Sequence, residues 1–389
     1  MTSSRNRRAA QVIFGLTMIT AAACAADRDD APTLARVHIT SNGVIHGDVL
    51  PVRYQPFDAP ELEHLADREQ LRALVAGTPR QFDQIVRVQD WVNAQWADGT
   101  PNPYPPWNAV TILDWIRSGK TGGFCAQYAQ VFLQSLAALG FTARYIEIGS
   151  RENPYAHYLT EVWSNDFDKW MVMDADFNVH FERNGVPLSA VELHDALVSS
   201  TLADVVPVFH SRPGHATPSS WPLHTAELYY YLRYHLNANH LSRPGDPPFE
   251  RFSDMIELDD ARVPAWEVSP VASAYPKERL TRQRTSDRHV VSGKLNQVQL
   301  DIRSAVPGSV TLELRDNIMQ RAAYEYRLMT TGAQPEAWHS TSASTITVRL
   351  PDAGGRLDVR GVNIRGVTGP SATLAIDPAE AARRAESQP

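Results

Sequence analysis

Two segments in the first half of the chain have apolar residues at helical spacing. In residues 82–96 the apolar positions that share one helical face are Ile85, Val88, Trp91, Val92 and Trp96. Residues 125–140 show the same spacing and end at Gly140, a residue type that favours helix termination. These patterns predict two core helices. A shorter helix is predicted over 109–119, directly after a proline-rich loop.

Strand patterns follow the second helix. Residues 143–149, 157–164 and 169–181 are rich in β-branched and aromatic residues, and turn-forming sequences separate them. Residues 188–240 have a mixed and mostly helical pattern, with TAELYYYLRYHLNANHL (225–241) as the strongest predicted helix. Because aromatic residues lie on several of its faces, we expect this helix to be largely buried against the rest of the fold.

From about Asp254 the chain changes to short runs of alternating polarity separated by turn residues. These runs are 296–304, 309–316, 344–351 and 356–366. Their spacing predicts a β-sandwich of the immunoglobulin or fibronectin kind over 251–376. Residues 377–389 are polar and have no periodic apolar face, so we expect a disordered tail.

The N-terminus has the features of an export signal. Residues 1–23 combine three arginines, a short interrupted apolar run and small residues before Cys24. TAAAC resembles a bacterial lipobox, which implies a lipid on Cys24, although cleavage without lipidation stays open. We therefore expect an exported protein in the periplasm or cell envelope, anchored to the membrane through Cys24. Residues 24–60 are expected to be a tether and short N-terminal segment, with one alternating run at 36–43 compatible with a strand.

Composition narrows the class of protein. The 389 residues are 43% hydrophobic and 21% charged, which excludes a disordered polymer and leaves room for two or three domains. The net charge is −7, and loss of residues 1–23 makes it −10, so nucleic acid is not expected as a partner. We find no Walker loop, dinucleotide fingerprint or Gly-x-Ser-x-Gly elbow, and we expect no cofactor.

One cysteine is a candidate nucleophile. If Cys24 is lipidated, Cys125 is the only thiol left and cannot form an intramolecular disulfide. A buried cysteine that packs as a small hydrophobe is the alternative. Cys125 begins the second predicted helix, and a helix N-terminus lowers the pKa of a thiol because its N–H groups and dipole favour the thiolate. Gly122 and Gly123 allow close backbone approach, so the Cys125 amide is a candidate oxyanion donor.

A base and an orienting acid follow at the predicted strands. His157 begins the second strand, and Asp174 ends a neighbouring one, which completes a possible Cys-His-Asp arrangement. Asp176 lies two residues further on the same strand face and is a rival to Asp174. Side-chain donors that could complete an oxyanion hole are Trp107, Asn108 and Gln127.

No metal site is expected from the histidines. The pairs His210 with His215 and His235 with His240 are five residues apart, a spacing that does not put both imidazoles on one helical face as zinc ligands four residues apart would be.

Three segments resemble the transglutaminase-like superfamily of papain-type thiol enzymes. GGFCAQYAQVFLQSLAALGFTARYI resembles its Cys box, HYLTEVW its His box and KWMVMD its Asp box, within about residues 80–182. Leu159 stands where an aromatic residue is usual, and Asp-Ala replaces the frequent Asp-Pro.

The resemblance also implies roles for single residues. Cys125 would be the nucleophile, His157 the base and Asp174 the orienting acid, because the spacing from Trp170 to Asp174 matches the family. Asp176 is then expected to cap the following turn. The resemblance implies a structural role for Glu161.

These observations predict an α+β architecture. A papain- or transglutaminase-like core with a helical extension would occupy 61–250, and the β-sandwich would follow. The predicted function is cysteine-dependent processing of amides through an acyl-thioester on Cys125. Peptides, proteins or peptidoglycan-like amides are the expected substrates, and the constant supply of water favours hydrolysis over acyl transfer to an amine. The alternative is a noncatalytic module that binds envelope glycan or peptide. We expect a monomer.

Overall fold

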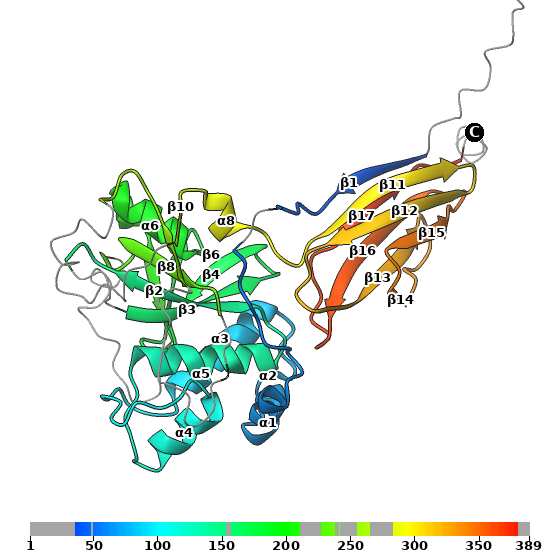
Figure 1. The fold of residues 1–389 in the computed structure, drawn as a ribbon. Coiled ribbons are helices and arrows are strands. Elements are labelled where there is room, and N and C mark those ends of the chain that lie inside the picture. Colours follow the sequence, from blue (N-terminus) through cyan, green and yellow to red (C-terminus); the bar gives the residue numbers. More distant parts are fainter. Residues whose placement is uncertain are drawn as a thin grey trace, which may run out of the picture.

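The computed structural model describes residues 36–47, 50–152, 157–210, 227–237, 241, 255–264 and 283–379. They form an α+β lobe and an elongated β lobe beside it (Figure 1). The predicted export signal and Cys24 lie outside the described residues. No helix in the described part of the chain is long and apolar enough to cross a membrane.

A six-stranded sheet forms the centre of the α+β lobe. Its strands are, in order, β10 (Gln283–Thr285), β9 (Met255–Leu258), β8 (Tyr231–His235), β2 (Ala143–Gly149), β3 (His157–Ser164) and β4 (Lys169–Met173). All neighbours are antiparallel except β10 and β9, which are parallel. The central strands are buried on both faces, since helices cover one face and a second small layer covers the other.

The helix α5 (Cys125–Ala138) packs between this sheet and three other helices. Every residue from Ala126 to Ala138 is buried, as expected for a helix that is apolar nearly all round. The helix ends at Ala138, and Gly140 shortly after it has a φ of +83°, which glycine adopts readily. The three helices are α1 (Pro60–Arg68), α3 (Gln81–Asn93) and α4 (Ala109–Arg117), and the short helix α2 (Leu71–Val75) packs against α1 and α3. The helices predicted over 82–96, 109–119 and 125–140 are therefore confirmed.

A smaller layer lies on the opposite face of the sheet. Its elements are β5 (Val179–Arg183), β6 (Val186–Pro187), β7 (Val206–Phe209), α6 (Ala190–Val198), the 3₁₀ helix η1 (Leu202–Asp204) and α8 (Arg288–Ser292). Apolar side chains from β5, α6 and β8 form a second core there.

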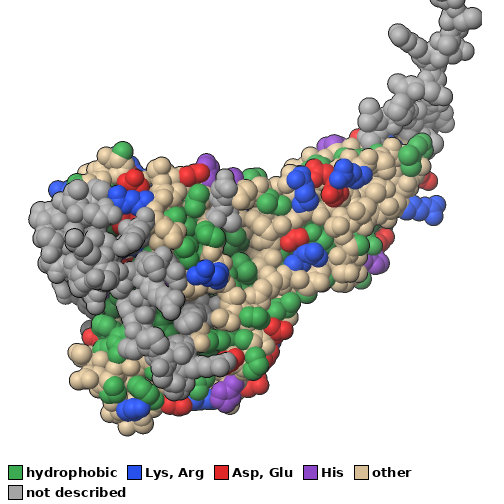
Figure 2. Space-filling view, viewed as in Figure 1, with side chains coloured by type: hydrophobic (Ala, Val, Ile, Leu, Met, Phe, Trp, Pro, Cys, Tyr) green, Lys and Arg blue, Asp and Glu red, His purple; other side chains and the backbone are tan. Residues whose placement is uncertain are grey.

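The β lobe is a sandwich of two sheets. The five-stranded sheet has the order β1 (Val37–Ser41), β17 (Ala372–Ile376), β16 (Gly355–Asn363), β13 (Arg321–Thr330) and β14 (His339–Thr341). The three-stranded sheet consists of β11 (Val298–Val306), β12 (Ser309–Asp316) and β15 (Thr345–Arg349). Alternate residues of both sheets meet in one apolar core. On the face in Figure 2, side chains of both charge signs are interspersed along this lobe.

A loop of the β lobe contacts the end of α5. The Asn363 side chain donates to the Gly140 carbonyl at 2.8 Å, and the Arg365 guanidinium donates to the Phe57 carbonyl at 2.6 Å. The sandwich thus supports the C-terminal end of the helix that begins with Cys125.

The helix predicted over 225–241 is wrong, because residues 231–235 form the strand β8. Tyr231, Leu232 and Tyr234 are buried, since β8 lies between β2 and β9 with both faces covered. In a short segment that is buried on all sides, apolar residues occur at nearly every position, so their spacing cannot distinguish a strand from a helix.

The predicted domain boundaries also differ from the structure. β9 and β10 fall within 251–376 but belong to the α+β lobe, so the sandwich strands that follow begin at β11. β1, from the predicted tether, pairs with β17 and completes the larger sandwich sheet. Residues 377–379 are ordered, because the Asp377 and Ala379 N–H groups donate to the Arg36 and Asp352 carbonyls. The rest of the predicted disordered tail lies outside the described residues.

Candidate active site

Cys125 is the first residue of α5, and its side chain is partly exposed. The first N–H groups of a helix have no partner within the helix, so they are directed at whatever lies beyond its N-terminus. The free thiol is thus accessible at a site that favours negative charge.

The turn before Cys125 packs closely against the loop after α3. A Cβ on Gly122 would lie 2.7 Å from the carbonyl oxygen of Thr100, and one on Gly123 would lie 2.8 Å from the indole nitrogen of Trp96. The Gly123 carbonyl accepts hydrogen bonds from the Gly99 amide and the Trp96 indole. Glycine is therefore required here for close approach.

Replacing Gly122 with alanine is expected to push the loop away from the Cys125 turn. The backbone around the new Cβ must shift, which costs about 1–3 kcal/mol as overpacking does elsewhere. Thermal denaturation should show a lower midpoint, and iodoacetamide should react more slowly with Cys125. An unchanged midpoint and rate would show that the close contact has no role. Alanine at the solvent-facing Gly47, whose Cβ would meet no atom within 4 Å, is the matched control.

His157 is the first residue of β3 and is only 4% exposed. Its Nε2 lies 2.7 Å from Oδ2 of Asp174, which leaves Nδ1 for the thiol. The Phe177 ring packs on the imidazole at 4.8 Å between centroids. Burial opposes the positive charge, but the Asp174 carboxylate and hydrogen bonds to Asp174 and Cys125 outweigh it and raise the pKa of His157 well above 6.5.

Asp174 follows β4 directly and is 2% exposed. While its Oδ2 is bound to His157, its Oδ1 accepts hydrogen bonds from the amides of Asp176 and Phe177. The turn-capping role predicted for Asp176 therefore belongs to Asp174. One carboxylate both closes the turn and orients the imidazole.

Side chains of α3 fix the turn that contains both acids. Gln89 Nε2 donates to the Asp174 carbonyl at 3.3 Å and to the Asn178 side chain at 3.1 Å. Asn93 Nδ2 donates to the carbonyls of Ala175 and Asp176. Sequence reasoning did not identify these positioning residues. The signal was present, because Gln89 is a fully buried polar residue within the apolar face of α3.

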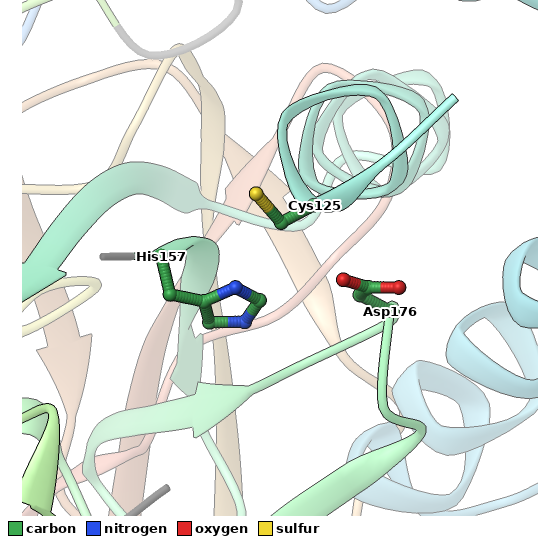
Figure 3. A group of neighbouring side chains, drawn as sticks. All are labelled: Cys125, His157 and Asp176. Atoms are coloured by element: carbon green, nitrogen blue, oxygen red, sulfur yellow. The ribbon is translucent and has the colours of Figure 1, made fainter. Parts of the chain in front are cut away.

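Asp176 lies beside the thiol and the imidazole. Cys125 Sγ, one ring nitrogen of His157 and one Asp176 carboxylate oxygen all lie within 4.8 Å of one another. Figure 3 shows the three side chains close together, from α5, β3 and the turn after β4. Burial, followed by repulsion from Asp174, raises the pKa of Asp176 to about 7, although His157 opposes the shift.

The three side chains proposed for the oxyanion hole occupy different places. The Asn108 side chain caps α4 by accepting from the Thr111 amide, and Trp107 packs in the core beside Tyr145. Gln127 Oε1 accepts from the Phe124 amide at the start of α5, while its buried Nε2 has no partner among the described residues. Of the three, only Gln127 lies at the N-terminus of α5 beside Cys125, and its Nε2 is a donor without a partner among the described residues.

The histidines of the two pairs that lie among the described residues contact other side chains. His215 and His240 lie outside the described residues. His210 bonds to His180, and His235 packs beside Tyr145. Cys125, His157 and Asp176 lie close together, but the ring of His157 is already engaged by Asp174 through Nε2. The predicted lack of a metal thus stays a prediction.

The fold and this geometry define an α+β domain whose central helix begins at a thiol beside an imidazole and carboxylates, an arrangement compatible with a Cys-His-Asp enzyme. Residues 68–175 match the model of the Transglutaminase-like superfamily, so this part of the chain is similar to that superfamily, as the sequence motifs predicted.

The comparison with curated proteins gave no match. The crystal structure of red sea bream transglutaminase is 13% identical, with a TM-score of 0.25, over 87% of this chain. The chain covers 62% of the length of that transglutaminase.

Proposed function

We propose that this protein is a thiol enzyme that processes amides through an acyl-thioester on Cys125. The observation that supports this best is the partly exposed sulfur at the start of α5 beside an imidazole whose Nε2 is bound to the buried Asp174. A core cysteine that only fills space needs neither an imidazole partner nor a carboxylate behind it.

In the first step the Cys125 thiolate attacks the amide carbonyl carbon. A C–S bond forms, and the π electrons of the carbonyl move to its oxygen, which the free amides at the start of α5 are placed to bind. The raised pKa of His157 keeps its ring protonated at neutral pH, so it can give a proton to the amine as the C–N bond breaks. Asp174 stabilises the imidazolium until then.

In the second step an acceptor resolves the thioester. Neutral His157 removes a proton from the acceptor, which attacks the carbonyl carbon, and the C–S bond breaks to restore the thiolate and the imidazolium. Water as acceptor gives a protease or amidase, and an amine gives an acyl transferase. We propose hydrolysis of peptide or peptidoglycan-like amides, supported by the constant presence of water.

Alkylation of Cys125 at pH 6 tests the thiol–imidazole pair. An ordinary thiol with a pKa of about 8.5 is under about 1% thiolate at this pH. We expect iodoacetamide to modify the wild type at least about 10-fold faster than His157→Ala, with a chelator present to exclude bound metal. p-Nitrophenyl acetate should then leave one acetyl group on the wild type by intact mass, and none on Cys125→Ala. Equal alkylation rates would instead favour the noncatalytic binding module.

The cellular location is a separate proposal. The export signal and lipobox-like sequence support an envelope protein anchored through Cys24. Labelling of cells with radioactive palmitate should mark the wild type and leave Cys24→Ala unmarked. Equal labelling of the two would refute the anchor without affecting the enzyme proposal.

A further inference from the structure

A second carboxyl group faces the reacting atoms in addition to the one that orients His157. The backbone on both sides of Asp176 is fixed, because its amide donates to Asp174 Oδ1 at 3.0 Å and its carbonyl accepts from Asn93 Nδ2 at 2.7 Å. Its side chain, which is half-buried, is thereby directed to the space between Cys125 and His157 (Figure 3). Neither the turn nor the imidazole needs this second carboxyl group.

The charges around Asp176 decide its protonation. The titratable groups that face it are Cys125 from α5, His157 from β3, Asp174 from its own turn and the exposed Asp98 from the loop after α3. From α3, the uncharged Gln89 and Asn93 hold the carbonyls of this turn, and the carboxyl group of Asp90 accepts from the Asn178 side chain at 2.9 Å. Two carboxylates so close together cannot both ionise freely, and Asp174 is the one paired with an imidazolium. The proton therefore belongs on Asp176.

We propose that Asp176 is a further catalytic residue of the reaction centre: in its protonated form it donates a hydrogen bond to the substrate oxygen that becomes negative, and its ionisation slows acylation. This inference rests on the proposed function. The distance of at most 4.8 Å from its oxygen to Cys125 Sγ leaves the carbonyl group under attack within reach of the acid.

The proposed role needs no net proton transfer to or from Asp176. The thiolate adds to the carbonyl carbon, the π electrons go to oxygen, and that oxygen accepts the hydrogen bond from the Asp176 carboxyl. When the C–N bond breaks, the leaving amine takes its proton from His157, and Asp176 keeps its own. An ionised Asp176 would place a negative charge beside both the thiolate and the developing oxyanion, which raises the barrier.

A pair of alkylating reagents reports the charge of Asp176 without any substrate. Iodoacetamide is neutral and iodoacetate is an anion, and both react with the same thiolate, so the ratio of their rates cancels the thiolate fraction. We expect the iodoacetamide rate divided by the iodoacetate rate to rise about 5- to 10-fold in the wild type as the pH passes through about 7. The reason is that the ionised Asp176 carboxylate, within 5 Å of the sulfur, repels the iodoacetate anion. Asp176→Asn should show no step, and Asp98→Asn should move the step to lower pH.

Acylation by p-nitrophenyl acetate then tests the hydrogen bond. As the pH rises above 7, the acylation rate of the wild type should fall relative to that of Asp176→Asn. The asparagine keeps a hydrogen-bond donor but cannot become charged. Asp176→Ala should be about 10-fold slower than Asp176→Asn at pH 6, with the Cys125 amide as the remaining donor. A flat reagent ratio in the wild type, or equal acylation of the alanine and asparagine variants, would overturn this role. The proposed function fails separately, if wild-type Cys125 reacts like an ordinary thiol.

Discussion

Replacing Asp174 with alanine is expected to lower the rate of acylation by about 10²- to 10⁴-fold. The variant loses the only carboxylate bonded to His157 Nε2 among the described residues, so the imidazole loses its orientation and the partner of its positive charge. It also loses the acceptor for the amides of Asp176 and Phe177. The burst of nitrophenolate from p-nitrophenyl acetate measures the rate, and circular dichroism checks the fold.

Asparagine at the same position separates the two roles of Asp174. Its Oδ1 can still accept from the two amides, so the turn and the thermal midpoint should be retained. The imidazole loses its ionised partner, and we expect acylation to be nearly as slow as in Asp174→Ala. If Asp174→Asn instead keeps more than half of the wild-type rate, Asp174 only closes the turn. A matching loss in Asp176→Asn would then identify Asp176 as the orienting acid.

Sequence alone placed the site residues near one another but could not assign their contacts. The alternation expected over 169–181 put Asp174 and Asp176 on one strand face, but β4 ends at Met173 and Asp176 lies in the turn before β5. Which carboxylate reaches His157 depends on how the chain turns after β4. Asp174 caps that turn with one oxygen and binds the imidazole with the other, a division that no residue pattern reports.

The support from α3 shows a second limit. The apolar spacing of α3 predicted the helix and its buried face, but the prediction did not include Gln89, which the structure shows to be fully buried within that face. Its partners, Asp174 and Asn178, are more than 80 residues away in sequence. Local spacing can therefore point to a buried polar group but cannot name its partner.

Sheet membership was the least predictable part of the fold. The sandwich strand β12 showed regular alternation, and β2 and β3, although buried, were marked by β-branched and aromatic residues between turn-forming sequences. The sequence of β8 resembled a helix because the strand is buried throughout. β1 belongs to a sheet in which even the strand nearest to it in sequence, β13, begins some 280 residues later. Pairing over such distances is decided by tertiary packing, which a local pattern does not contain.

Replacing Glu161 with glutamine is expected to destabilise the α+β lobe by about 3–5 kcal/mol. Glu161 is fully buried, its Oε2 accepts from Arg144 Nε at 2.8 Å, and its Oε1 accepts from the Ala190 amide. The variant leaves the Arg144 guanidinium charged between the Trp170 and Tyr234 rings without a counterion. At about 2–4 °C per kcal/mol for a domain of this size, the thermal midpoint should fall by about 6–20 °C.

A double variant distinguishes a structural ion pair from a functional one. In Arg144→Met with Glu161→Leu both charges are replaced by apolar side chains of similar length, so no uncompensated charge remains and most of the lost stability should return. Because neither residue contacts Cys125 or His157, acylation per folded molecule should stay close to wild type, which agrees with the structural role predicted for Glu161. A double variant that folds normally but acylates slowly would contradict this, and would show that the β2–β3 pair transmits its geometry to His157.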